Sequence, residues 1–297
     1  GLEWGIPVPS DPSHTLYVWF DALVNYLTVA GWGTSEEKFS NFWPYAYHLV
    51  GKDILRFHAV LWPGMLMAAS LPLPRRIFAH GWWTVEGEKM SKSRGNVVDP
   101  YLMIDRYGVD RFRYFLMREV SFGLDGDFSE KALIERSNAD LSDNFGNFVH
   151  RTLGMVWRYK KGVVKKPSPY QDGEWEKLLE EVKEGFQYYM ERFAFSQALE
   201  QVWKLVHFAN RYIEREAPWK LHKEGKEKEV ENLLYRLLDN ARLLSFFLYP
   251  FMPDTTLKLR ELLGLQQDPG EESLCWQGGP EVYSVEEAQP LFPRIIE

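Results

Sequence analysis

This chain of 297 residues has almost no cysteine and contains no long hydrophobic run. The single cysteine, Cys275, excludes an intrachain disulfide and a cysteine-rich zinc site. It also favours a reducing compartment, so we expect a cytoplasmic protein. The longest apolar stretch, residues 59–71, is interrupted by Pro63 and is too short to cross a bilayer. The opening residues have neither the basic nor the apolar part of an export signal, so we expect no membrane or secretory role.

An excess of positive charge is also lacking, because 35 lysines and arginines face 42 acidic residues and the net charge is −7. This balance excludes a protein that coats polyanions in general, so any nucleic acid has to be held by local basic patches. One such patch is "GEKMSKSRGN", residues 87–96, where basic and hydroxyl side chains lie between two glycines. These groups can surround a phosphate, although a solvated surface turn is the alternative for this pattern alone.

Strand and helix patterns alternate in the first part of the chain. The β-branched and aromatic run at 15–20 predicts a strand that leads into a helix ending at Gly31. Residues 46–51 and 76–87 predict two more strands, and Pro63 should kink or break the apolar helix between them. The alternation predicts a parallel, doubly wound sheet, in which ligands collect at the carboxyl ends of the strands.

From Asp99 onward, helical patterns dominate and strand patterns nearly vanish. Asp99-Pro100 and Ser129-Glu130 are typical helix starts. The apolar residues of "LFPRII", 291–296, predict a tail that packs back on the body. The periodicity predicts a helix bundle with helices at about 100–118, 129–160, 174–191, 194–216, 226–249 and 254–263.

Five motifs then occur together in one order: "WGIPVP", "YVWFDALVNY", "HLVGKDILRFHAVLWPGML", "HGWWTVEGEKMSKSRGNVVDP" and "NRYIEREAPW". "KMSKS" resembles the signature loop of class I aminoacyl-tRNA synthetases, and the whole set closely resembles the methionyl-tRNA synthetase family, from Trp4 to about Leu265. The resemblance implies an α/β fold followed by an all-α fold. Along the chain, the resemblance implies four parts: the second half of a Rossmann-type catalytic domain (1–98), a connecting, stem-contact-like segment (99–128), a helix-bundle anticodon-binding domain (129–265) and a C-terminal tail that packs back (266–297).

The resemblance assigns a methionine pocket to Trp19, Ala22, Tyr26, Ile54 and His58. Ala22 and Tyr26 lie four residues apart, as do Ile54 and His58, so each pair shares one face of a helix. An aromatic and aliphatic slot suits an unbranched, polarizable thioether. Without the family, Trp19 and Ile54 would be interpreted as ordinary core residues.

ATP contacts are likewise implied by the resemblance. Asp53 is expected at the ribose and His80 near the adenine, while Lys89 and above all Lys92 are the expected catalytic residues, which neutralise the charge of the departing pyrophosphate. Mg²⁺ is expected with the triphosphate and no metal site is expected in this chain. The full ATP-binding set is Gly51, Asp53, His80, Lys89, Ser91 and Lys92.

The resemblance places recognition of the CAU anticodon at Asn147, Arg151, Pro218 and Trp219. Bases of a single-stranded loop stack on aromatic rings and bond to polar side chains, which fits these residue types. Packing at a helix junction is the alternative for Trp219. A basic cluster could hold tRNA phosphates or be a solvated loop: Arg158, Lys160, Lys161, Lys165 and Lys166.

The implied function is the ATP-dependent activation of L-methionine to methionyl-adenylate and its transfer to tRNA(Met). The His-x-Gly-His motif of class I synthetases does not occur among the seven histidines. We therefore expect a fragment whose missing N-terminal half is supplied by the rest of the enzyme or by a partner chain. Two alternatives stay open: a non-catalytic tRNA-binding fragment, or a class I synthetase for leucine, isoleucine, valine or cysteine.

Overall fold

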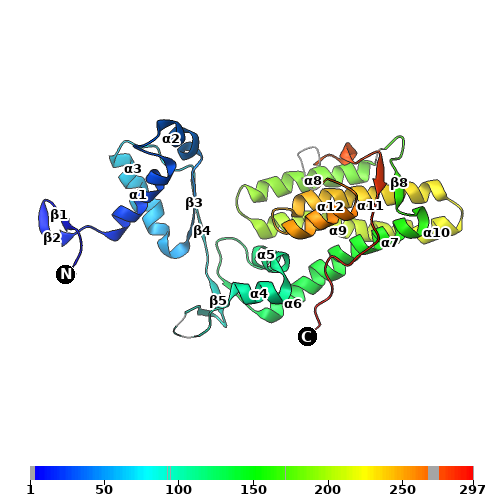
Figure 1. Ribbon diagram of the computed structural model, residues 1–297, viewed down its shortest axis with the longest axis horizontal. Helices are drawn as coiled ribbons and strands as arrows, with labels where there is room; N and C mark the ends of the chain where they lie inside the picture. Colours follow the sequence, from blue (N-terminus) through cyan, green and yellow to red (C-terminus); the bar gives the residue numbers. More distant parts are fainter. Residues whose placement is uncertain (1–3, 92, 94, 171, 267–273, 297) are drawn as a thin grey trace. The chain divides into compact units, whose positions relative to one another are not determined.

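The computed structural model describes residues 4–91, 93, 95–170, 172–266 and 274–296 (Figure 1). The chain forms two compact units. Unit 1 runs to Trp82 and includes Gly123–Asp125, whereas unit 2 holds Trp83–Phe122 and the chain from Gly126 onward. Within the described residues, every helix is too short or too polar to span a membrane.

Unit 1 combines a short antiparallel strand pair, three α-helices and a parallel strand pair in its described residues. Its α1 forms because Leu23, Leu27 and Ala30 repeat at helical spacing and are buried, and it ends as predicted at Gly31, whose φ is 96°. The elements of unit 1 are β1 (Pro7–Val8), β2 (Asp11–Thr15), α1 (Val18–Ala30), α2 (Glu36–Phe42), β3 (Tyr47–Gly51), α3 (Trp62–Ala68) and β4 (Arg76–His80).

Strands β3 and β4 pair in parallel, in a register that runs from Tyr47 opposite Arg76 to Gly51 opposite His80. The strand predicted at 46–51 is confirmed, and so is the first part of the one predicted at 76–87. Because the two strands run in the same direction, their carboxyl ends lie side by side, and the segments that follow Gly51 and His80 start at one edge.

The strand predicted at 15–20 is wrong, because Val18 to Phe20 form the first turn of α1 and β2 already ends at Thr15. β-branched and aromatic residues favour strands only where a pleated surface is packed. Here Trp19 lies one turn before Leu23 and packs against the buried cluster of unit 1. Burial on a helix face therefore decides the conformation of this run.

Pro63 does not break the helical run that follows β3. Residues Phe57–Leu61 form a π-helical turn directly before α3, and Pro63 occupies the first turn of α3. Proline has no N–H to donate to the carbonyl four residues earlier, and a wider turn accommodates that loss. The predicted interruption is thus a local π-turn within a helical run.

Unit 2 opens with three short strands, β5 (Trp83–Val85), β6 (Glu88–Lys89) and β7 (Gly126–Asp127). Strand β5 pairs antiparallel with β6 and parallel with β7. Between β6 and β7 lie α4 (Pro100–Tyr107) and α5 (Val109–Arg118), and Asp99 caps α4 by accepting the N–H of Tyr101. Gly108, with φ 86°, separates them, so the helix predicted at 100–118 is two helices.

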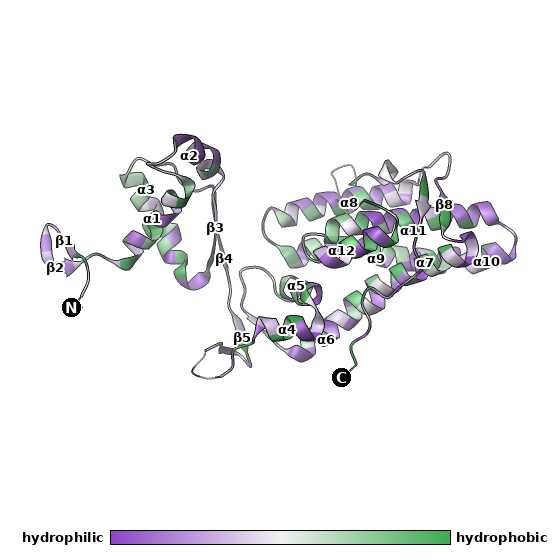
Figure 2. Cartoon of the chain, viewed as in Figure 1, coloured by the Kyte–Doolittle hydropathy of each residue, from purple (hydrophilic) through white to green (hydrophobic). Residues whose placement is uncertain are grey.

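A helical bundle makes up the rest of unit 2 and confirms the predicted helices from 129 to 263, with small shifts at their ends. Figure 2 shows hydrophobic and hydrophilic residues on each long bundle helix, as amphipathic packing requires. The short α10 was not predicted, although Pro218 stands at its first position. The bundle consists of α6 (Glu130–Arg136), a π-helical stretch (Ser137–Gly146), α7 (Asn147–Lys160), α8 (Gly173–Met190), α9 (Phe195–Glu216), α10 (Pro218–Lys223), α11 (Glu227–Leu248) and α12 (Pro253–Leu262).

A strand pair closes one side of the bundle. Strand β8 (Val163–Lys165) pairs antiparallel with β9 (Val282–Ser284), and neither strand was predicted. The basic cluster of residues 158–166 therefore spans the end of α7 and strand β8 rather than a loop, although Arg158, Lys161 and Lys165 are exposed to solvent.

A buried polar network ties α11 to distant segments. Asp239 is fully buried, and its carboxylate accepts hydrogen bonds from Arg242 (2.5 Å), Tyr283 (3.1 Å) and Tyr170 (3.3 Å). Arg242 also donates to the carbonyl oxygen of Cys275 at 2.7 Å. Burial raises the pKa of the Asp239 carboxyl, while Arg242 opposes that rise. Both charges depend on these partners in an interior that solvates charge poorly.

The tail packs back on unit 2, largely as predicted. Phe292 is buried, Leu291 packs against the bundle core, and Ile295 is partly buried. The backbone of Ile295 exchanges two hydrogen bonds with the side chain of Asn138, at 2.9 and 3.0 Å. Ile296 is 89% exposed, so its predicted packing is wrong.

Candidate functional site

The residues predicted for the methionine pocket come from α1 and from the helical run after β3. The hydroxyl of Tyr26 lies 2.8 Å from Nε2 of His58, and Nδ1 of His58 lies 3.0 Å from the carbonyl oxygen of Ile54. The ring centroid of Trp19 is 5.7 Å from that of His58. The structure thus brings Trp19, Tyr26, Ile54 and His58 together, while Ala22 is exposed on the α1 face that carries Trp19 and Tyr26.

The hydrogen bonds of His58 have a defined direction. A carbonyl oxygen only accepts, so Nδ1 of His58 carries a proton, and in the neutral ring Nε2 accepts the hydroxyl hydrogen of Tyr26. Burial raises the pKa of Tyr26, which keeps that hydroxyl a donor. Polar atoms are therefore bonded to one another inside an aromatic cluster, which leaves an apolar surface for an uncharged side chain.

Three members of this cluster were missed from the sequence: Phe57, His48 and Trp62. Phe57 stacks on Trp19, with centroids 4.3 Å apart and planes at 9°. The indole N–H of Trp62 donates to Nε2 of His48 at 3.1 Å. Burial, and to a smaller extent His58, lowers the pKa of His48 to about 4. In the structure, burial alternates along β3 and His48 lies on the same buried side as Val50, whereas the run Tyr-His-Leu-Val shows no such alternation in the sequence.

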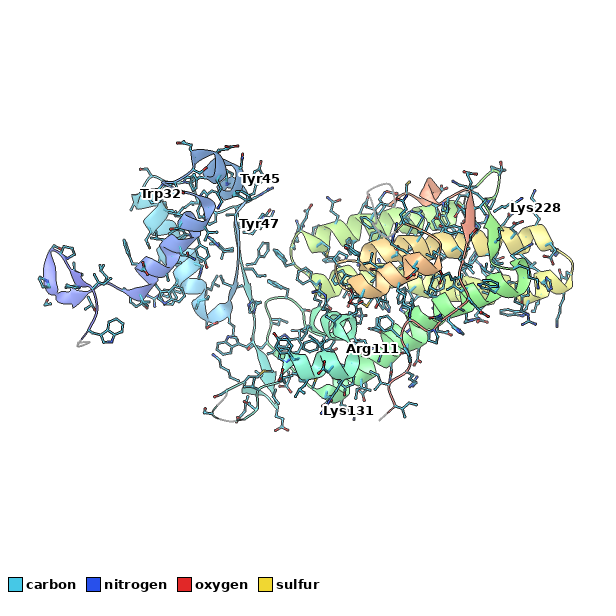
Figure 3. The ribbon with its side chains drawn as sticks, viewed as in Figure 1. Trp32, Tyr45, Tyr47, Arg111, Lys131 and Lys228 are labelled. Carbon is cyan, nitrogen blue, oxygen red and sulfur yellow. The ribbon has the colours of Figure 1, made fainter. Side chains whose placement is uncertain are left out.

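A cavity of about 490 Å³ adjoins this cluster, between α1, α2 and β3. Tyr26 and His48 line it, together with the exposed Tyr45 and Tyr47, which Figure 3 labels at the surface of unit 1. Among the residues predicted for the methionine pocket, Tyr26 is the one that lines this cavity in the part of the chain that the structure describes. Tyr26 therefore faces two environments, the His58 cluster and an open apolar cavity.

Three of the residues predicted to bind the nucleotide, Gly51, Asp53 and His80, lie together where β3 and β4 end. Gly51 pairs with His80 in the strand register. A Cβ placed on Gly51 would lie 2.6 Å from Oδ1 of Asp53 and 3.9 Å from Cε1 of His80. The Asp53 carboxylate therefore lies directly over Gly51, where a side chain would displace it. A carboxylate at such an edge can accept hydrogen bonds from a pair of sugar hydroxyls.

The basic loop of residues 87–96 belongs to unit 2. Glu86 and Gly87 both have positive φ, 54° and 74°, and form the two-residue turn between β5 and β6. Asn96, which sequence reasoning missed, accepts the N–H of Ser91 at 2.8 Å and donates to the carbonyl of Lys89 at 3.4 Å. The Asn96 side chain thus contacts the backbone of both Lys89 and Ser91. Lys92 lies outside the described residues, as does Arg94.

The residues predicted to read the anticodon lie on α7 and α10. Nη2 of Arg151 lies 2.5 Å from Glu214, near the end of α9 from which α10 departs. Pro218 is buried, and Trp219 is partly buried and packs against the bundle core. Asn147 lines a different region, a cavity of about 580 Å³ shared with His150 and with the tail residues 290–294. His150 and the tail wall were missed from the sequence.

Two members of the basic cluster already have intramolecular partners. Lys160 pairs with Glu227 at 3.1 Å. Lys166 donates to the carbonyl of Gly279 at 3.2 Å and lies 3.8 Å from Glu281. Their charges are therefore partly compensated within the bundle.

Two family models match consecutive parts of the chain. A family model described as "tRNA synthetases class I (M)" matches residues 1–153. A second, described as "Anticodon-binding domain of tRNA ligase", matches residues 172–292.

Curated relatives match nearly the whole chain. The methionine–tRNA ligase of Caldanaerobacter subterraneus is 48% identical over 99% of this chain and 47% of the relative. That of Fusobacterium nucleatum is 45% identical over 99% of this chain and 48% of the relative. The chain thus spans about half the length of the curated relatives it matches.

Two solved structures of a methionyl-tRNA synthetase are also similar to this chain. A crystal structure of Mycobacterium tuberculosis methionyl-tRNA synthetase bound by methionyl-adenylate has a TM-score of 0.88 and 38% identity, over 98% of this chain and 59% of that one. The apo form of that enzyme has a TM-score of 0.87 and 35% identity, over 100% of this chain and 59% of that one.

Proposed function

The chain belongs to the class I tRNA synthetases of the (M) family, and from this membership we propose that it is part of a methionine–tRNA ligase. The whole protein would condense L-methionine with ATP to methionyl-adenylate, release pyrophosphate, and transfer the methionyl group to tRNA(Met). The observation that carries the proposal is the helical run after β3. It places Asp53 beside Gly51 and His80, and His58 beside Tyr26 and Trp19.

This run would set the geometry of the first reaction step. The methionine side chain would lie against Trp19, Ala22, Tyr26, Ile54 and His58. The polar tips of Tyr26 and His58 are already bonded to each other. Thioether contacts with aromatic rings favour this side chain. Asp53, one to two helical turns away, would hold the ribose of ATP. The methionine carboxylate would then attack the α-phosphorus with no covalent protein intermediate, accelerated by positioning and electrostatics.

ATP would enter as its Mg²⁺ complex, so the metal belongs to the substrate in this proposal. Gly51, Asp53 and His80 would hold the nucleoside. Lys89 and Lys92 of the 87–96 loop would neutralise the triphosphate, and the Ser91 hydroxyl would donate a hydrogen bond to it. Lys92 is proposed as the principal catalytic residue from the loop pattern alone, since it lies outside the described residues.

Recognition of tRNA is proposed for the bundle. Residues 1–98 would then be catalytic, 99–128 connecting, 129–265 anticodon-binding and 266–297 a supporting tail. Asn147 and Arg151 would reach base edges, and Trp219 after Pro218 would offer a stacking face. The match of residues 172–292 to an anticodon-binding domain supports the part of this assignment that concerns Pro218 and Trp219.

The rest of the ATP site would come from an N-terminal half, on the same polypeptide or on a partner chain. We propose that the complete enzyme acts in the cytoplasm, where tRNA is charged. A tRNA-binding fragment without chemistry is the second candidate for the chain taken alone, because the chain spans about half of its relatives.

Pyrophosphate exchange tests the proposal. The full-length protein that contains this chain should exchange pyrophosphate with methionine, and should do so poorly with leucine, isoleucine, valine or cysteine. Lys92→Ala should slow exchange greatly and leave methionine affinity nearly unchanged. The isolated chain should show no exchange and still bind an anticodon stem-loop. Faster exchange with another amino acid would contradict the assignment of methionine as the substrate. Undiminished exchange in Lys92→Ala would contradict the catalytic role of Lys92.

A further inference from the structure

A short segment of the chain returns to unit 1 after α5 and touches the end of β4. A Cβ placed on Gly81 would lie 2.1 Å from the carbonyl oxygen of Leu124 and 2.7 Å from the backbone nitrogen of Asp125. Real Cβ atoms do not approach backbone atoms so closely, so position 81 requires glycine. The two backbones are therefore in direct contact, which fixes Asp125 beside Trp82.

The Asp125 carboxylate binds two groups at once. Its Oδ1 accepts the backbone N–H of Trp82 at 2.8 Å, and its Oδ2 lies 2.5 Å from Nζ of Lys52. These hydrogen bonds, first that of Lys52 and then that of Trp82, lower the pKa of the Asp125 carboxyl. The Lys52 ammonium also lies 4.4 Å from the centroid of the Trp82 ring. Asp125, Lys52 and Trp82 therefore form one interlocked group.

This group reaches the nucleotide edge through the indole of Trp82. The Trp82 Nε1–H donates to Oδ1 of Asp53 at 3.3 Å, and that carboxylate lies over Gly51. The carbonyl of Gly81, in the peptide packed against Leu124, lies 2.8 Å from Nδ1 of His80. Asp53 and His80 thus both bond to the dipeptide Gly81-Trp82, which is itself held by Leu124 and Asp125.

We propose that Asp125 and Lys52 are positioning residues for nucleotide binding. They hold Trp82 in the orientation that fixes the Asp53 carboxylate, and so they act on ATP without touching it. This inference rests on the proposed function, because it takes Asp53 as a ribose ligand. Lys52 and Asp125 are 39% and 43% exposed, and exposed ion pairs add little to stability. The pair should therefore affect ATP binding more than unfolding.

The test is a comparison of KM values in pyrophosphate exchange by the full-length protein that contains this chain. Asp125→Asn keeps an acceptor for the Trp82 N–H and faces Lys52 with a donor. It should raise KM for ATP about tenfold, a size typical of coupled residues in one network, and change KM for methionine less than about twofold. Lys52→Met, which keeps an unbranched side chain and removes the charge, should do the same. The double variant should be no worse than either single one.

Glu181→Gln is the matched control, because Glu181 forms a similarly short and exposed pair with Lys204 in the bundle, at 2.6 Å with 59% and 40% exposure. It should leave both KM values unchanged. An unchanged KM for ATP in Asp125→Asn would overturn the inference, and so would a joint rise of both KM values with a lower melting temperature. A wild-type protein without methionine-dependent exchange would instead overturn the proposed function.

Discussion

The hydroxyl of Tyr26 donates to Nε2 of His58 across 2.8 Å, in a direction set by the bond between Nδ1 of His58 and the carbonyl of Ile54. His58 is 1% exposed, so water cannot replace this donor easily. One hydroxyl on α1 thereby satisfies a buried ring on the helical run after β3. The pair joins the two elements from which the methionine pocket is proposed.

Removal of this hydroxyl should loosen unit 1. Tyr26→Phe leaves a buried acceptor without its donor, which should cost about 1–2 kcal/mol. Hydrogen exchange of peptides from α1, followed by mass spectrometry, should show faster exchange. Tyr45→Phe is the control, since Tyr45 is 65% exposed and should leave exchange unchanged. Equal exchange in wild type and Tyr26→Phe would show that the bond contributes nothing.

Acid should destabilise unit 1 through His48. Its pKa is lowered from 6.5 to about 4, chiefly by burial, so the unfolded chain takes up the proton at higher pH than the folded chain. This contribution to stability is fully present above pH 6.5 and is lost as the pH falls toward 4, by about 3 kcal/mol in total. Thermal unfolding of unit 1 between pH 7 and pH 4 measures it.

His48→Gln tests the assignment, because glutamine keeps an acceptor for the indole of Trp62 and does not titrate. The variant should lose less stability than the wild type over this pH range. Parallel losses in the two proteins would assign the acid sensitivity to other groups.

Substitution of Gly81 should be far more costly than substitution of a glycine in open space. A Cβ at position 81 meets the Leu124 carbonyl at 2.1 Å, and backbone atoms cannot move away cheaply. Gly81→Ala should lower the unfolding free energy of unit 1 by about 2–3 kcal/mol. Gly154 in α7 has nothing within 4 Å of its added Cβ, so Gly154→Ala should be neutral or stabilising by up to about 1 kcal/mol. Similar melting curves for the two variants would contradict the close approach.

Trp219 offers a test of RNA recognition by the bundle. Trp219→Ala should weaken binding of an anticodon stem-loop by about 1–3 kcal/mol if a base stacks on the indole. Trp157→Ala on α7 is the control, because Trp157 is also a partly exposed bundle tryptophan, at 38%. A change confined to folding stability, with binding intact, would leave Trp219 as a packing residue.

Local sequence patterns predicted the bundle well, since Leu, Val and aromatic residues repeat along α9 and α11 over many turns. They failed at Trp19, where the strand preference of a short aromatic run was outweighed by burial along α1. They also missed β8 and β9, because their pairing joins segments far apart in the chain and leaves no local signature.

The candidate site, like the fold, could be predicted only in part from the sequence. Motifs singled out Gly51 with Asp53 and Tyr26 with His58, and the structure brings the members of each pair together. The partners that orient them were not visible, because Asp125 lies 73 residues from Lys52 and carries no motif that links the two. Hydrogen-bond partners of this kind depend on the fold, which a pattern of residue types does not contain.

The pairing of β9 with β8 and the packing of Phe292 have a consequence for biosynthesis. During translation, α7 to α11 leave the ribosome before the residues that complete their core, Tyr283 and Phe292 among them. Until then Asp239 has Arg242 and Tyr170 as partners but lacks the third donor, the Tyr283 hydroxyl. The nascent bundle should therefore remain protease-sensitive until residues 282–295 emerge, and its maturation should follow the synthesis of this segment.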